Sequence, residues 1–77
     1  MQRIPANASL TNVKNLLFTN NHNIAKLLFV DHDGNPVVLE QPQINCFHPV
    51  NHTFSICSEN KTLYVYWRSI HEIHQCS

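Results

Sequence analysis

The stretch Ile24-Ala-Lys-Leu-Leu-Phe-Val30, followed by Asp31-His-Asp-Gly-Asn-Pro36 and Val37-Val-Leu-Glu40, decides the fold. Its first seven residues are apolar on both faces, which is typical of a strand that is covered above and below. The Asp-Gly pair at Asp33 and Gly34 is a strong hairpin signal. This part of the chain therefore predicts two antiparallel strands joined by a tight turn.

The chain before this hairpin predicts one helix. Four apolar residues recur at helical spacing on one face: Leu10, Val13, Leu16 and Leu17. Ser9 precedes them and is a favourable N-cap residue. Residues 1–8 contain Pro5 and lack periodicity, so we expect a flexible N-terminal arm there and a single small domain over residues 9–77.

The chain after the hairpin predicts further strands with short turns between them. Pro42 cannot donate to a central ladder, so it indicates a bulge or an edge before the strand at residues 44–47. Alternating patterns follow at residues 53–57 and 62–67, and a short strand closes the chain near Ile70. The predicted fold is mainly β: an N-terminal helix, then a small antiparallel barrel of about five strands.

The segment Val65-Tyr66-Trp67-Arg68-Ser69-Ile70 adds a family resemblance. It is similar to the Val-Tyr-Lys-His-Ala-Ile segment of the bacterial Sm-like (Hfq) family, at the passage from the fourth strand to the fifth. The order of elements and the chain length resemble that family as well. The resemblance implies an Sm-like barrel, related to SH3-like barrels, in a homo-oligomeric ring of about six subunits that binds single-stranded RNA as a regulator or RNA chaperone.

The resemblance suggests RNA contacts, although the residue types differ from the family pattern. Trp67 and Arg68 occupy the positions of the family's Lys-His pair; arginine binds phosphate and tryptophan stacks on bases. His71 and Lys61 are the other candidates. The alternatives are a buried core role for Trp67 and a solvated surface charge for Arg68.

The resemblance also suggests a subunit interface. An open barrel leaves N–H and C=O groups unpaired at its edge strands, and strand pairing between subunits satisfies them. Tyr64, Tyr66 and Ile70 are the residues expected at or near this interface. The alternative is that they are core or surface residues of a monomer.

A small zinc-stabilised domain is a further alternative. Cys46, His48, His52 and Cys57 offer four nitrogen and sulfur donors within a short stretch. Their spacing completes none of the common zinc motifs, so we expect no cofactor and interpret these residues as separate side chains.

Composition limits the other functional classes. The formal net charge is zero, which excludes a strongly basic nucleic-acid-binding arm and leaves a non-enzymatic protein-interaction or adaptor module as an alternative. With only five carboxylates and no nucleophile paired with a base, we expect no enzyme activity. The odd count of three cysteines and the lack of a secretory signal or long apolar run favour a reducing, cytoplasmic location and no membrane association.

Overall fold

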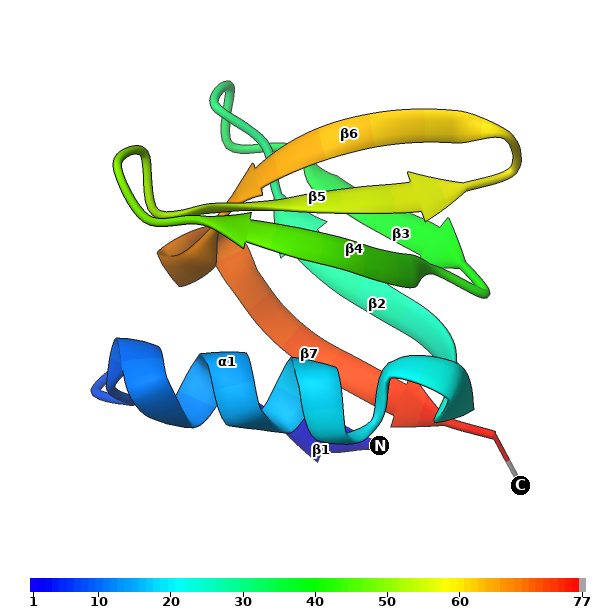
Figure 1. Cartoon of the computed structure of the whole chain (residues 1–77), viewed down its shortest axis with the longest axis horizontal. Helices are drawn as coiled ribbons and strands as arrows, with labels where there is room; N and C mark the ends of the chain where they lie inside the picture. The colour runs from blue at the N-terminus through cyan, green and yellow to red at the C-terminus, as the bar shows by residue number, and fades with distance from the viewer. Residues whose placement is uncertain (77) are drawn as a thin grey trace.

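The computed structural model describes residues 1–76 and has seven strands and one α-helix in that range (Figure 1). The helix α1 spans Leu10–Thr19, and single 3₁₀ turns cover Asn21–Asn23 (η1) and Trp67–Ser69 (η2). The strands are β1 (Gln2–Arg3), β2 (Ile24–Val30), β3 (Pro36–Glu40), β4 (Gln43–His48), β5 (Thr53–Ser58), β6 (Lys61–Tyr66) and β7 (Ile70–Gln75). The mainly β class expected from the sequence is confirmed.

The strands form two antiparallel sheets, in the orders β1-β7-β2-β3 and β4-β5-β6. The described residues form no closed barrel, and the five-stranded barrel expected from the sequence is replaced by these two sheets. One reason is the break between β3 and β4, where Gln41 has a φ of 45° and Pro42 lacks an N–H. The chain turns at these two residues, so β3 and β4 belong to different sheets.

The two sheets are nevertheless linked at the break. The Gln41 N–H donates to the Ala25 carbonyl over 2.7 Å, next to the paired residues Lys26 and Glu40. The buried Ser58 hydroxyl, from the end of β5, donates to the Glu40 carbonyl over 2.8 Å. These bonds hold the end of β3 against both β2 and β5.

Residues 2–4, within the N-terminal arm expected over residues 1–8, lie along β7. Gln2 and Arg3 pair with Ile73 and Glu72, and the Ile4 N–H donates to the His71 carbonyl over 2.8 Å. This pairing makes β1 a strand that the sequence did not predict. Its residues carry no periodic pattern, because a strand this short is determined by its partner.

In Figure 1 the helix α1 lies below β4, β7 descends obliquely beside it, and the helix contacts β4 and η2. Its start agrees with the sequence, since the Ser9 hydroxyl accepts a hydrogen bond from the Asn12 N–H over 3.1 Å. Val13 and Leu17 are the buried helix residues. The helix therefore covers the apolar end of the space between the sheets.

The core combines side chains from both sheets and the helix. Its fully buried members are Val13, Leu17, Leu27, Phe54, Ile56 and Ile73. Burial of each large apolar side chain stabilises the fold by about 1.5–3 kcal/mol. Since the members come from α1, β2, β5 and β7, one apolar cluster holds the two sheets together.

The turns use few glycines. Gly34, the single glycine of the chain, has a φ of 83° in the β2–β3 turn, and the Asp31 carboxylate accepts from the Asp33 and Asn35 N–H groups over 2.9 Å. Among the residues that the structure describes, four others have a positive φ: Gln41, His52, Glu59 and Asn60. Within residues 1–76, no helix has the length and hydrophobicity to cross a bilayer.

Candidate nucleic-acid interface and sheet edges

The 3₁₀ turn η2 contains two of the predicted RNA contacts. Trp67 is only 8% exposed and belongs to the core, so its ring is not available for stacking on a base. The sequence placed it at the end of a strand, whereas it begins η2. Arg68 is exposed, lies 4.5 Å from the Trp67 ring centroid and donates from one Nη to the Ala6 carbonyl over 3.3 Å. The alternative role for Trp67, a core residue, is therefore the correct one.

Three of the four predicted contacts are brought together, and one is not. Trp67, Arg68 and His71 line the same surface pocket, together with Ile4 and residues of the following loop. Lys61 is the first residue of β6, at the other end of that strand from η2. The four residues therefore do not form one site.

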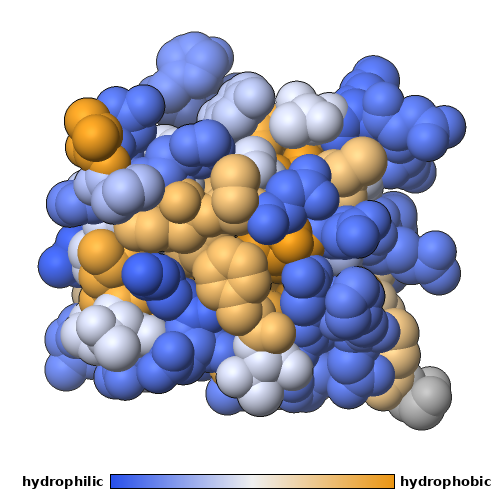
Figure 2. Space-filling view, viewed as in Figure 1, coloured by the Kyte–Doolittle hydropathy of each residue, from blue (hydrophilic) through white to orange (hydrophobic). Residues whose placement is uncertain are grey.

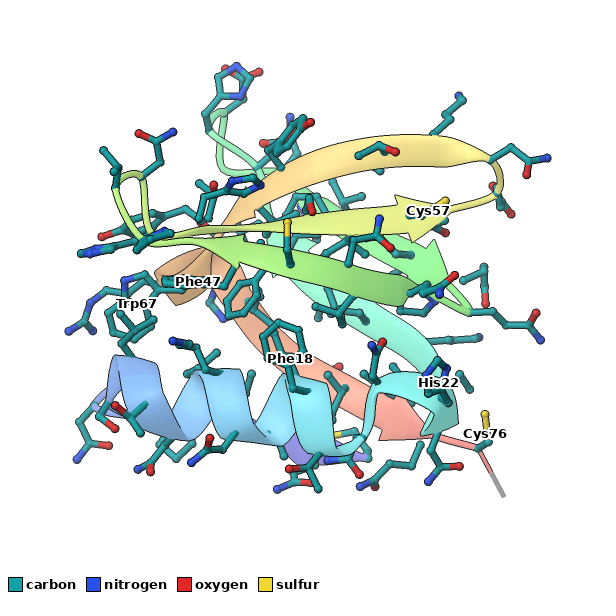
Figure 3. All side chains as sticks on the ribbon, viewed as in Figure 1. Phe18, His22, Phe47, Cys57, Trp67 and Cys76 are labelled. Atoms are coloured by element: carbon teal, nitrogen blue, oxygen red, sulfur yellow. The ribbon has the colours of Figure 1, made fainter. Side chains whose placement is uncertain are left out.

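A second group of side chains near η2 was not predicted as an RNA site. Phe47 at the end of β4 has the Lys14 Nζ 4.7 Å from its ring centroid. The exposed His52 ring stacks on Phe47 at a centroid distance of 6.2 Å and an interplanar angle of 13°. Figure 3 shows Phe47 and Phe18 between α1 and β4, with Trp67 to the left of both.

A backbone hydrogen bond joins this group to η2, because the Trp67 N–H donates to the His52 carbonyl over 3.1 Å. We call the combined surface the aromatic rim and define it as Lys14, Phe47, His52, Trp67 and Arg68. In Figure 2, hydrophobic side chains form a band across this face, with hydrophilic ones around it. The aromatic rim thus combines two cationic side chains with the exposed His52 ring and the partly buried Phe47 ring, whereas Trp67 supports Arg68 from the core.

Local sequence patterns gave little indication of the aromatic rim. Lys14 is on the polar face of the predicted helix, and His52 was considered only as a zinc donor. The pairing of β4 with β5, which places Phe47 opposite Phe54, brings the turn containing His52 close to the helix. The one available signal was the adjacency of aromatic and basic residues between Phe47 and His52.

β6 is one of the two edge strands of the second sheet, and β4 is the other. β6 pairs with β5 over six residues, and among residues 1–76 no strand pairs with its other side. Tyr64 and Tyr66, predicted at an interface, are 68% and 45% exposed on this strand. Phe29, Val37, Leu63 and Val65 line a groove between β6 and the β2–β3 hairpin.

Ile70 does not share the exposure of the two tyrosines. It is 3% exposed and contributes to the core, because it pairs with Phe29 of β2 at the start of β7. Its side chain is therefore not on the surface of the single chain, and the interface prediction for Ile70 needs this correction.

The zinc array predicted as an alternative does not come together. The Cys46 Sγ lies 3.5 Å from the His48 Nε2 and 3.1 Å from the Ser55 Oγ. In the part of the chain that the structure describes, no group of three or more possible metal ligands is found, and His52 stacks on Phe47 instead. The three cysteines are free thiols.

Comparisons of this chain with protein-family models, with curated proteins and with solved structures found no match.

Proposed function

We propose that this protein is an Sm-like RNA-binding protein that assembles edge to edge into a ring of about six subunits. The observation that carries the proposal is the unpaired outer edge of β6, which has two exposed tyrosines and leads through η2 directly into β7.

The order of elements supports an Sm-like topology. If β3 and β4 are counted as one strand bent at Gln41 and Pro42, and β1 is set aside, a helix and five antiparallel strands remain. In this account β6 and β7 are the two ends of one strongly curved sheet, connected by η2. The curved sheet is an open form of the barrel expected from the sequence.

The energetics of a small chain support assembly. A core of this size barely offsets the conformational entropy lost on folding, so chains of this length often depend on partner subunits. An unpaired edge also exposes N–H and C=O groups that a neighbour's strand can satisfy. If β6 of one copy pairs with β7 of the next, the contact is heterologous and rotation can close it into a ring.

The aromatic rim supports RNA as the ligand. Lys14 and Arg68 can bind phosphates, and the exposed His52 ring can stack on a base. The formal net charge is zero, so few phosphates are neutralised, and we expect weak binding that falls with salt along a shallow slope. Lys61, at the far end of β6, is a peripheral contact in this proposal.

The assembly is tested by light scattering. We expect a mass of about six times 8.9 kDa for the unmodified chain at high concentration. Tyr64→Lys with Tyr66→Lys should shift the mass toward the monomer, because lysine on an edge strand disfavours pairing. Val38→Lys is the control, since Val38 is also exposed but lies on β3. A monomer at every concentration would contradict the ring if it is found both for the unmodified chain and for Ile4→Pro, which removes the Ile4 N–H that donates to the His71 carbonyl of β7.

RNA binding is tested by filter binding of uridine-rich and adenine-rich single strands over a salt series. We expect Arg68→Ala to weaken binding and to reduce the slope of log K against log salt by about one. Lys26→Ala is the matched control, because Lys26 is exposed and pairs at 3.9 Å with Glu40 on the neighbouring strand β3. No affinity at low salt would remove RNA from the proposal.

The β6 edge favours one second candidate, a protein-interaction module. A bare edge beside an apolar groove can accept an extended peptide as an added strand. The neutral charge suits this role as well as it suits RNA binding. A monomer that retains a peptide and no nucleic acid during purification would favour this candidate.

A further inference from the structure

The chain's own N-terminal residues cover the edge of β7 that the proposed ring requires. β7 pairs with β2 on one side and with β1 on the other. Gln2 is opposite Ile73, Arg3 is opposite Glu72, and the Ile4 N–H donates to the His71 carbonyl over 2.8 Å. A second copy therefore cannot pair with this edge while residues 2–4 remain on it.

The attachment of these residues is limited. The pairing stops at Ile4 because Pro5 has no N–H to donate. The Arg3–Glu72 ion pair is 3.9 Å long and the Arg3 side chain is 80% exposed, so water screens it. Two surface pockets lie against the segment, one lined in part by Ile4 and His71 and the other by Gln2 and Leu16.

We propose that β1 is a displaceable strand that controls assembly by competing with β6 of a second copy for the edge of β7. This inference rests on the proposed ring and adds a regulatory step to it. In a single chain β1 has the advantage of being attached to the same molecule. The apparent affinity between copies is then reduced by the fraction of chains in which β1 has left the edge.

The occupant that fits the uncovered edge is β6 of another copy. Both β6 and β7 are six residues long, so the pairing can use the full length of each strand. When Ile4 leaves, the pocket floor that it shares with Val13, Trp67 and Ile70 is uncovered. The exposed rings of Tyr64 and Tyr66 on β6 supply apolar surface to cover such a floor.

A reversible covalent lock tests the competition. Arg3→Cys and Glu72→Cys introduce thiols at directly opposed positions, in a chain that also carries Cys46→Ser, Cys57→Ser and Cys76→Ser. Opposed cross-strand positions have suitable spacing for a disulfide. Oxidised glutathione takes up the two hydrogens as the disulfide forms. We expect the oxidised protein to have a mass of 8.9 kDa and the reduced protein to assemble.

A pair of point variants gives an independent measurement. Ile4→Pro removes the N–H that donates to His71, and Ile4→Ala keeps it. We expect Ile4→Pro to lower the protein concentration needed for half-maximal assembly about tenfold, which corresponds to about 1.4 kcal/mol. Ile4→Ala should lower it less.

The outcomes separate this inference from the proposed ring. If the oxidised protein assembles as well as the reduced protein, β1 does not control assembly, although the ring can still be correct. If the reduced protein and Ile4→Pro both stay monomeric at every concentration, the ring is wrong and the competition is wrong with it. Assembly of the reduced form alone supports both.

Discussion

β6 and β1 are outer strands of the two sheets, and they are attached in very different ways. β6 pairs with β5 at all six of its residues and buries Val65 to 2% exposure. β1 pairs with β7 at two residues, and its neighbour Ile4 is only partly buried. β6 is therefore an integral part of the fold with one bare side, whereas β1 is an accessory strand.

The difference shows how one chain can leave the outer edge of β6 exposed while its own β1 covers the edge of β7. An edge strand that is fixed by its own core contacts keeps its geometry, and its outer side stays free to pair with a partner's strand. A strand held by few contacts can leave without unfolding the rest, since local opening costs less where little apolar surface is buried. The comparison predicts that substitutions in β5 and β6 lower the free energy of unfolding most and that substitutions in β1 lower it least.

The largest effect is expected where β6 is anchored. Phe54 of β5 is fully buried opposite Val65, so Phe54→Ala should lower the free energy of unfolding by about 3–5 kcal/mol. Urea denaturation followed by the fluorescence of Trp67, the single tryptophan of the chain, measures this loss. A loss below 1 kcal/mol would mean that the β5–β6 pair is not the rigid part of the fold.

A matched pair of variants sharpens the comparison at an intermediate size. Val65→Ala should cost about 2 kcal/mol, because it leaves a cavity in the core, and Ile4→Ala about 1 kcal/mol or less, because Ile4 is partly exposed. The same denaturation experiment compares them. Equal losses would show that β1 is as firmly held as β6.

The smallest effect is expected at the surface of β1. Arg3→Ala removes an ion pair with Glu72 in which the arginine side chain is 80% exposed, so stability should change by about 0.5 kcal/mol or less. Lys26→Ala, which removes a pair of the same length with Glu40, is a suitable control in thermal unfolding. A loss well above that of the control would mean that Arg3 fixes β1 more strongly than its exposure implies.

The features that the sequence predicted well depend on local patterns. The bounds of β2 match the apolar run Ile24–Val30, and the Ser9 cap precedes α1. Both follow from spacing and residue type within a few positions. By contrast, β1 exists because Gln2 and Arg3 meet Ile73 and Glu72 at the other end of the chain, and no local pattern encodes that pairing.

The candidate site was harder to predict for a similar reason. A tryptophan beside an arginine suggests base stacking, but the direction of Trp67 depends on where η2 turns the chain, and the turn points it into the core. Lys14, Phe47 and His52 come from a helix, a strand and a turn. Their proximity is produced by the packing of α1 against β4, which spacing along the chain does not reveal.

The positive φ angles described above have a consequence for how far this fold can be improved. Gln41, His52 and Glu59 adopt left-handed backbone conformations at a cost of the order of 1 kcal/mol each, whereas Asn60 is of a residue type that tolerates such angles. Glycine would adopt the same angles without that cost. Glycine substitutions at these turns should therefore raise the free energy of unfolding. At the β5–β6 turn such a substitution would leave every core contact unchanged, and the more stable chain would tolerate substitutions that otherwise unfold it.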